Sequence, residues 1–349
     1  MRTEPSSTAT PPEPAPWPEN PVLTQVWRGG HVESQHRGAW VLVDTAGSVL
    51  DGAGDAEQPI FARSSLKSLQ ALPLVESGAA DRFELGEEGL ALALASHNAE
   101  PCHTACVERV LARLGLSPDD LRCGPQPPGD ADTRRALARD GRPPGRVHNN
   151  CSGKHAGFLA LTRHLGADPR GYLDPDGPTQ RAVRAAVAEM TGLAPESLYG
   201  GIDGCSAPTF RMPLSRLATA IARVANPEGL APERRAACER MQRAVARHPH
   251  LIAGNRRRLC TDLARAGGGT LFPKLGGEAV YVIGAVGRDR ALAIKVDDGS
   301  ARGFQALALE LCRRLGWLDA GQLEALAAWR AGPLTNWAGE PVGRVEVVA

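Results

Sequence analysis

The sequence predicts an α/β protein in which an antiparallel sheet lobe packs against a helical lobe. Residues 39–54 and 278–300 each read as two strands joined by a short turn of glycine or polar residues. Segments with helical spacing occupy the middle of the chain. Strands near both ends around a helical middle therefore indicate one sheet assembled from the two ends of the chain.

The length and composition predict one large domain of two closely packed lobes. The chain has 349 residues, of which 42% are hydrophobic, so it can bury a sizeable core. Residues 1–20 are rich in Pro, Ser and Thr, and we expect a disordered tail there. We expect residues 21–349 to form a single domain.

The elements between the two strand pairs are predicted mainly as helices. Residues 120–147 are rich in Pro and Gly, so they mark either a crossing between the lobes or the border of an active site. Apolar residues recur with helical spacing in seven further segments. These are residues 87–98, 103–116, 155–166, 179–192, 214–226, 234–249 and 304–318.

Charge and cysteine usage narrow the class of partner. The net charge is +1, so no overall field favours nucleic acid or an anionic membrane, and we expect a small-molecule partner. No apolar run approaches the roughly 18 residues of a membrane span, and the start lacks the pattern of a signal peptide. The eight cysteines include no CxxC pair, which favours reduced thiols. We expect a cytoplasmic protein.

Lysine is scarce in this chain. Only four of the 40 basic residues are lysines: Lys67, Lys154, Lys274 and Lys295. Arginine stays protonated in proteins, whereas a buried lysine amine can become neutral and act as a base or a ligand. Three of the four lie in Ser- or Gly-rich contexts, although a compositional drift toward Arg explains the scarcity equally well.

The stretch "RSSLKS" contains the first of these lysines. If a helix begins near Ser64, then Ser64 and Lys67 stand at i and i+3 on one face, where the amine can take the hydroxyl proton. Ser65 and Ser68 lack such a partner. Pro73 is expected to kink or end this helix. Serine is also common at helix starts for capping, so the motif alone is weak.

The stretch "FPKLGGEAVYVIG" places Lys274 at the head of a predicted strand. It resembles the K-T-G strand of penicillin-recognising enzymes, with Leu275 in place of Thr. In those enzymes this strand faces a helix that carries S-x-x-K. Ser96, in "SHN", is the nearest candidate for their third element, S-D-N.

Four motifs together resemble the asparaginase II family of serine-dependent L-asparaginases. They are "RSSLKSLQALPLVESGAA", "ASHNAEP", "HNNCSGKHAGFL" and "GIDGCSAPTF", and the similarity extends over residues 20–345. The resemblance implies a fold of the β-lactamase/glutaminase type. It also implies two Ser-Lys pairs at one site, Ser64 with Lys67 as its base and Ser96 with Lys274. The sequence does not settle which of the two serines attacks first.

The same resemblance implies a zinc site and a substrate contact. The zinc ligands fall on Cys151, Lys154 and Cys205, and Asp203 matches an acidic residue near the substrate's amino group. Thiolates are good zinc ligands, and a neutral amine can supply a third. The alternative is that the two cysteines are small buried core residues. A homodimer is also expected.

Other polar residues keep plainer interpretations. One arginine of "NRRRLC" could bind a substrate carboxylate, but the sequence does not choose among Arg256, Arg257 and Arg258. Cys102 and Cys106 are interpreted as buried thiols on a helix.

The expected function is hydrolysis of L-asparagine to L-aspartate and ammonia. A glutaminase is the alternative among enzymes, because one methylene is worth only about 1–3 kcal/mol of discrimination. A zinc-binding, non-catalytic relative is the alternative from another class.

Overall fold

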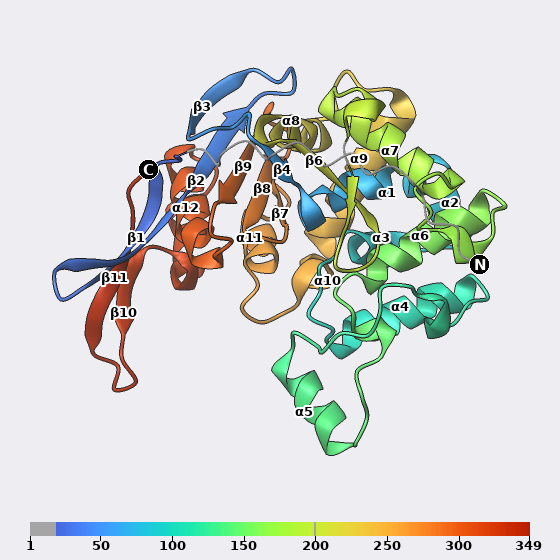
Figure 1. The fold of residues 1–349 in the computed structure, drawn as a ribbon, viewed down its shortest axis with the longest axis horizontal. Helices are drawn as coiled ribbons and strands as arrows, with labels where there is room; N and C mark the ends of the chain where they lie inside the picture. Colours follow the sequence, from blue (N-terminus) through green and yellow to red (C-terminus); the bar gives the residue numbers. More distant parts are fainter. Residues whose placement is uncertain (1–18, 199) are drawn as a thin grey trace, which may run out of the picture.

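The computed structural model describes residues 19–198 and 200–349 and divides into a sheet lobe and a helical lobe (Figure 1). The predicted α/β architecture is confirmed. Most of the predicted tail, residues 1–18, lies outside the described residues. Asn20, at the end of that predicted tail, is buried and donates a hydrogen bond to Asp297 at 3.0 Å.

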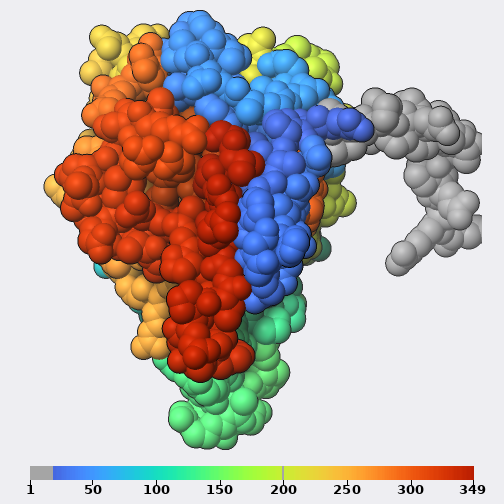
Figure 2. Space-filling model, turned by 90° about the vertical axis from the view of Figure 1, so that its left-hand side faces the viewer, coloured from blue at the N-terminus to red at the C-terminus, as the bar shows by residue number. Residues whose placement is uncertain are grey.

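The sheet lobe is antiparallel, and in the described chain it contains eight strands. Its order is β10-β11-β1-β2-β9-β8-β7, with β3 beside β2. These strands are β1 (Val22–Arg28), β2 (His31–Val43), β3 (Val49–Ala53), β7 (Leu271–Leu275), β8 (Val280–Ala285), β9 (Arg290–Val296), β10 (Gly332–Thr335) and β11 (Pro341–Val347). The predicted pairs β2–β3 and β8–β9 are confirmed. The pairing of β1 with β11 places the two ends of the described chain side by side (Figure 2).

Helices cover both faces of this sheet. Helix α8 packs closely on β8, because Gly284 of β8 has no side chain and leaves room for Ala225 of α8. Helix α12 packs closely on β9 in the same way, because Gly303 of α12 leaves room for Val296 of β9. Gly284 pairs with Ala291 of β9, which lies five residues before Val296. Because side chains alternate along a strand, α8 and α12 pack on opposite faces.

The helical lobe is built from the middle of the chain. The α-helices of the described chain are α1 (Lys67–Glu76), α2 (Ala79–Arg82), α3 (Gly86–Ala93), α4 (Pro101–Arg113), α5 (Ala131–Arg139), α6 (Ser152–His164), α7 (Pro178–Thr191), α8 (Leu214–Ala225), α9 (Pro232–Arg247), α10 (Pro249–Ala253), α11 (Leu259–Gly267), α12 (Ala301–Arg314) and α13 (Ala320–Ala325). Short 3₁₀ helices are η1 (Arg63–Leu66), η2 (Pro118–Asp120), η3 (Arg146–His148), η4 (Pro169–Gly171), η5 (Pro195–Ser197) and η6 (Ala327–Trp329). Within the described ranges, no helix has the length and apolar character needed to cross a membrane.

Two local features go beyond what the sequence predicted. Pro73 does not end its helix, because α1 continues to Glu76. Nearly all of α1 is buried against α6, α7 and α9, and this packing outweighs the hydrogen bond that proline removes. The Pro- and Gly-rich segment also contains a helix, α5, whose first turn is capped by the Asp130 carboxylate at the backbone N–H of Thr133.

A second, small sheet lies beside the start of η1. It has the order β4-β6-β5, with bounds β4 (Pro59–Phe61), β5 (Gly200–Ile202) and β6 (Pro208–Pro213). The backbone N–H of Ala62 donates to Phe210 of β6, so this sheet holds the chain just before Ser64. The loop between β5 and β6 carries Asp203 and Cys205.

Candidate active site

Lys67 is the first residue of α1 and is fully buried. Its Nζ lies 3.1 Å from Ser96 Oγ and 3.2 Å from Cys151 Sγ, and it also donates to the carbonyl of Ala95. The preceding η1 turns the chain so that the lysine enters the interior. Arg63, at the start of η1, has φ of 51°, a strained conformation of the kind found at functional sites.

The hydroxyl of Ser96 lies between two lysine amines. Lys274 of β7 donates to Ser96 Oγ at 3.0 Å and to the carbonyl of Leu275 at 2.9 Å. Ser96 follows the end of α3, and its backbone N–H is held by the carbonyl of Ile252 at 2.9 Å. The helical lobe, the sheet lobe and the loop after α3 thus meet at this one hydroxyl.

Burial changes the protonation of both amines. Burial, with a second contribution from the charge of Lys67, lowers the pKa of Lys274 from 10.5 to about 7. The pKa of Lys67 is also lowered, again mainly by burial. A buried amine with a pKa near neutrality can exist as a neutral base at neutral pH, which arginine cannot.

Of the three serines in "RSSLKS", Ser64 is the one that lines a pocket. Ser65 is buried with its hydroxyl on the carbonyl of Ala62 at 2.5 Å, and the hydroxyl of Ser68 is buried away from the pocket. The expected hydrogen bond between Ser64 and Lys67 is absent from the described contacts, because the Lys67 amine points to Ser96 instead. Both Ser64 and Ser96 nevertheless face the same cavity.

The pocket has a volume of about 330 Å³ and a mostly polar wall. Its lining combines parts of both lobes and of the β5–β6 loop. It consists of Arg63, Ser64, Ser96, Gln126, Asn149, Asn150, Cys151, Asp203, Gly204, Cys205, Arg258, Leu275, Gly276 and Gly277. Gln126, Asn149 and Asn150 were not predicted individually as site residues. Their only signal was that Gln126 falls in the segment predicted to border an active site, and that the asparagines directly precede Cys151.

The three residues expected to bind zinc converge beside this pocket. Lys154 Nζ lies 3.2 Å from Cys205 Sγ, and the Cys205 thiol donates to Cys151. That hydrogen bond, together with the charges of Lys67 and Lys154, holds the pKa of Cys151 well below its usual value. Burial alone would lower the pKa of Lys154, but the two sulfurs raise it.

This donor set fits a zinc ion. Two sulfurs and one nitrogen are atom types that Zn²⁺ prefers, and one of the sulfurs is already poised to be a thiolate. The Lys154 amine would release its proton on binding the ion. Cys151 and Cys205 both line the pocket, so an ion held by these residues would lie at the pocket wall.

Asp203 is held by an arginine. Arg63 Nε and Nη2 contact the two carboxylate oxygens at 3.1 and 3.2 Å. Burial alone would raise the pKa of Asp203, but the hydrogen bonds from Arg63 and the charge of Lys154 outweigh it, and the pKa is lowered. Asp203 is therefore an ionised group in the pocket wall.

The structure distinguishes the three arginines of "NRRRLC". Arg258 lines the pocket and donates to the carbonyl of Ser96 at 2.6 Å. Arg256 is exposed and pairs with Asp132 at 2.5 Å, and Arg257 is also exposed. Only Arg258 of the three is placed to meet a substrate carboxylate.

A separate cluster surrounds the cysteines of α4. Glu100, Cys102 and His103 bring their potential ligand atoms within 4.8 Å of one another. The Glu100 carboxylate already accepts hydrogen bonds from the backbone and side chain of Asn255. Cys106 is buried as expected, whereas Cys102 is only partly buried.

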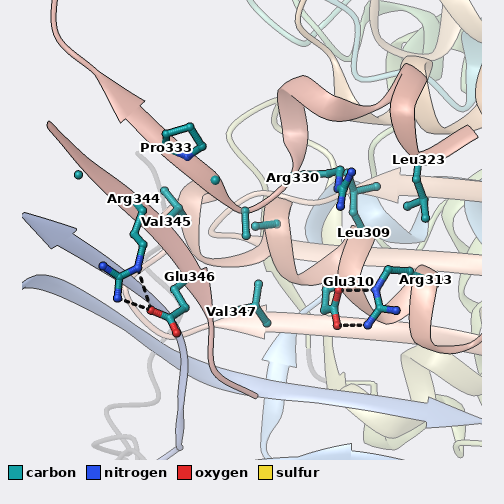
Figure 3. A pocket seen from close by; sticks show the side chains of 14 residues that line it. Leu309, Glu310, Arg313, Leu323, Arg330, Pro333, Arg344, Val345, Glu346 and Val347 are labelled. Atoms are coloured by element: carbon teal, nitrogen blue, oxygen red, sulfur yellow. Dashed lines mark hydrogen bonds and ion pairs between the residues drawn. The ribbon is translucent and has the colours of Figure 1, made fainter. Parts of the chain in front are cut away.

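Another cavity, of about 560 Å³, lies between α12 and the β10–β11 hairpin (Figure 3). Its walls carry the ion pairs Glu310–Arg313 and Arg344–Glu346. It shares no lining residue with the pocket of Ser64.

Fold and site together define an α/β protein of two lobes with a buried Ser-Lys cluster between them. The chain belongs to the L-asparaginase II family, whose family model matches residues 24–347. The resemblance inferred from the motifs is thus confirmed, and the family supports an amidohydrolase of the asparaginase type. No curated protein matches the chain.

Solved structures show more distant similarity. A β-lactamase from *Mycobacterium bovis* has 13% identity and a TM-score of 0.44, covering 81% of this chain and 95% of the other. Two structures of Mglu have 15% and 17% identity and TM-scores of 0.36 and 0.35. Each covers 80% of this chain, and the chain spans 60% and 66% of those two proteins.

Proposed function

We propose that the protein hydrolyses L-asparagine to L-aspartate and ammonia through a serine nucleophile. The observation that carries the proposal is the hydroxyl of Ser96 between the amines of Lys67 and Lys274, at a pocket that Ser64 also lines. Two amines with lowered pKa values that share one serine hydroxyl can accept a proton and return it. Family membership supports the amide as the reacting group.

In this proposal Ser64 is the nucleophile and Lys67 its base. Ser64 Oγ bonds to the side-chain amide carbon while its proton passes to Lys67. The C–N bond then breaks, and the nitrogen leaves as ammonia with a proton returned through Ser96 and Lys274. Water hydrolyses the resulting ester, which releases aspartate and restores the hydroxyl of Ser64. Backbone N–H groups would stabilise the oxyanion.

In the structure, Lys67 contacts Ser96 rather than Ser64. The proposal therefore requires the amine to turn toward Ser64 when substrate binds, as catalytic hydrogen bonds often tighten only in the substrate complex. A reaction in which Ser96 attacks first is the direct alternative, and comparing alanine variants of the two serines separates them.

Charged groups in the wall suit an amino acid substrate. Arg258 would bind the α-carboxylate, because a guanidinium matches a carboxylate with two N–H donors. Asp203 would accept a hydrogen bond from the α-amino group. Both lie in the same pocket as Ser64, so they can orient the side-chain amide toward it.

Cys151, Lys154 and Cys205 would hold zinc in this proposal. A bound ion there supplies a fixed positive charge beside the pocket that orients the substrate. The Ser-Lys residues themselves provide the nucleophile and the bases, so their proton transfers proceed as described above.

A glutaminase is the second candidate. The pocket volume of about 330 Å³ does not by itself reject a side chain longer by one methylene, which is worth only about 1–3 kcal/mol. A zinc-binding, non-catalytic relative is disfavoured because the contacts of Lys67 and Lys274 with Ser96 are intact.

An ammonia-release assay with asparagine and glutamine side by side tests the proposal, with Ser64→Ala as the inactive control. Faster release from asparagine supports it, and no release from either amide refutes it. A cytoplasmic location and a homodimer remain predictions, which cell fractionation and light scattering would test.

A further inference from the structure

A second cavity adjoins the pocket of Ser64. It has a volume of about 500 Å³ and shares two lining residues, Arg63 and Gly204, with that pocket. It lies against the small sheet β4-β6-β5. A substrate held in the first pocket could therefore extend past Arg63 and Gly204 into the second.

The second cavity has charged residues in its lining and exposed apolar side chains on the small sheet. The charged residues are Arg63, Arg211, Glu278, Lys295 and Asp297. Phe61 is 40% exposed and Ile202 is 82% exposed, and both are lining residues. Gly201 contributes to the same wall, and a Cβ there would lie 3.1 Å from the Phe61 ring. Glycine thus lets the ring pack directly on β5. Exposed large apolar residues gathered at one cavity are typical of a binding surface.

One buried hydroxyl in this cavity lacks a partner. Thr209 lines the wall on β6 with only 4% exposure, and its Oγ1 makes no hydrogen bond within the described chain. A buried polar group without a hydrogen-bond partner costs free energy, so binding of a ligand atom that forms a hydrogen bond with it is favoured. Thr209 pairs with Gly201 across the hairpin, and its Cγ2 methyl lies 4.0 Å from where a Cβ at Gly201 would be, so the Thr209 side chain lies on the face that carries the Phe61 ring.

The residues between the two cavities indicate which substrate atom would carry a group from the first cavity into the second. Arg63 lies in both linings, and it compensates the charge of Asp203 through two hydrogen bonds. Asp203 is the proposed contact of the α-nitrogen. Since the arginine already neutralises this carboxylate, the site can accept a neutral amide N–H as well as an ammonium group.

We propose that this cavity is a subsite for an apolar acyl group on the α-nitrogen of asparagine, so that N-acyl-asparagines are substrates. This inference rests on the proposed function and extends its substrate class. The acyl chain contacts Phe61 and Ile202, and its carbonyl accepts a hydrogen bond from Thr209. The reaction is unchanged: N-acyl-asparagine and water give N-acyl-aspartate and ammonia.

The test measures ammonia release from asparagine and from its N-acetyl, N-butanoyl and N-hexanoyl derivatives. We expect kcat/KM to rise about three- to fourfold per added methylene while the chain fills the cavity. Ile202→Ala and Phe61→Ala should lower the ratio of the hexanoyl value to the asparagine value by about tenfold. Thr209→Val keeps the shape and removes the hydroxyl, and should lower the same ratio about five- to tenfold.

Val49→Ala is the matched control, because Val49 is an exposed apolar residue on β3 outside this cavity. It should leave both values unchanged. The inference is overturned if acyl derivatives react more slowly than asparagine at every chain length, or if the Ile202 and Thr209 variants leave the ratio unchanged. Asparagine hydrolysis would then still support the proposed function.

If no amide is hydrolysed, the proposed function fails, and binding becomes the readout. Calorimetric titration with N-hexanoyl-aspartate and with aspartate compares the acylated and the free ligand on wild type and Ile202→Ala. Tighter binding of the acylated ligand, lost in the variant, supports the subsite. Equal binding of the two ligands overturns it.

Discussion

Replacing Lys274 by methionine tests whether the amine beside Ser96 is neutral near pH 7. Methionine keeps an unbranched side chain in the same buried space and removes the titrating group. The hydrogen bonds to Ser96 Oγ and to the carbonyl of Leu275 are lost with it. The variant therefore separates a pH-dependent effect of the charge from a pH-independent effect of the contacts.

The magnitude follows from the pKa. Burial lowers the pKa of Lys274 from 10.5 to about 7, which corresponds to about 5 kcal/mol against the charged form in the folded protein. Between these two pH values the unfolded chain binds more protons than the folded one, so the stability of the wild type rises with pH. Below pH 7 both states are protonated and the wild type carries the full cost.

The methionine variant lacks this dependence. We expect its free energy of unfolding, relative to wild type, to be higher by up to about 5 kcal/mol below pH 7 than above about pH 10.5. The two lost hydrogen bonds subtract about 1 kcal/mol each at every pH. The 5 kcal/mol is an upper value, because the charge of Lys67 also contributes to the low pKa.

Urea unfolding of both proteins across this pH range measures the difference. Parallel curves of stability against pH would show that the Lys274 amine keeps an ordinary pKa, and would refute the reasoning. Activity gives a second readout: wild-type kcat should rise as the pH passes through about 7, because only the neutral amine of Lys274 can accept the proton that Ser96 relays from Lys67. A flat profile through that region would contradict its role.

Three further predictions concern the nucleophile, its base and the metal. Ser64→Ala should lower kcat by several orders of magnitude in the ammonia assay while Ser65→Ala is mild, and equal losses would show that the wrong serine is assigned. Lys67→Arg should be inactive because arginine stays protonated, so near-normal turnover would mean that the amine serves only as a charge. Elemental analysis should find zinc in the wild type but not in Cys151→Ala or Cys205→Ala. Substoichiometric metal in all three proteins would indicate that the two cysteines are buried core residues and not zinc ligands. Chelation should raise KM more than it lowers kcat and should be easier at acid pH, whereas a collapse of kcat at unchanged KM would place zinc in the chemistry.

Local patterns were sufficient for much of the fold. The pairs β2–β3 and β8–β9 were predictable because alternation and a short turn specify a hairpin from neighbouring residues. The edge formed by β10, β11 and β1 was not, because β1 and β11 pair across nearly the whole chain. Helix α1 passes Pro73 because its burial, which no local pattern reveals, outweighs the proline.

The candidate site divides in the same way. The scarcity of lysine and the four motifs were enough to select Ser64, Lys67, Ser96 and Lys274 and to identify the family. The sequence could not choose among the arginines of residues 256–258, because only the course of the chain after α10 puts Arg258 in the pocket wall.

The sequence by itself determined which reactive groups the protein has and the family to which it belongs, because residue types and short motifs are local properties. Only the tertiary structure decided that Lys67 contacts Ser96 rather than its neighbour Ser64, and that Arg63 holds Asp203. The physical reason is that contacts between distant elements set distance and burial. Burial in turn sets the pKa of Lys274, and with it the chemistry that the amine can perform.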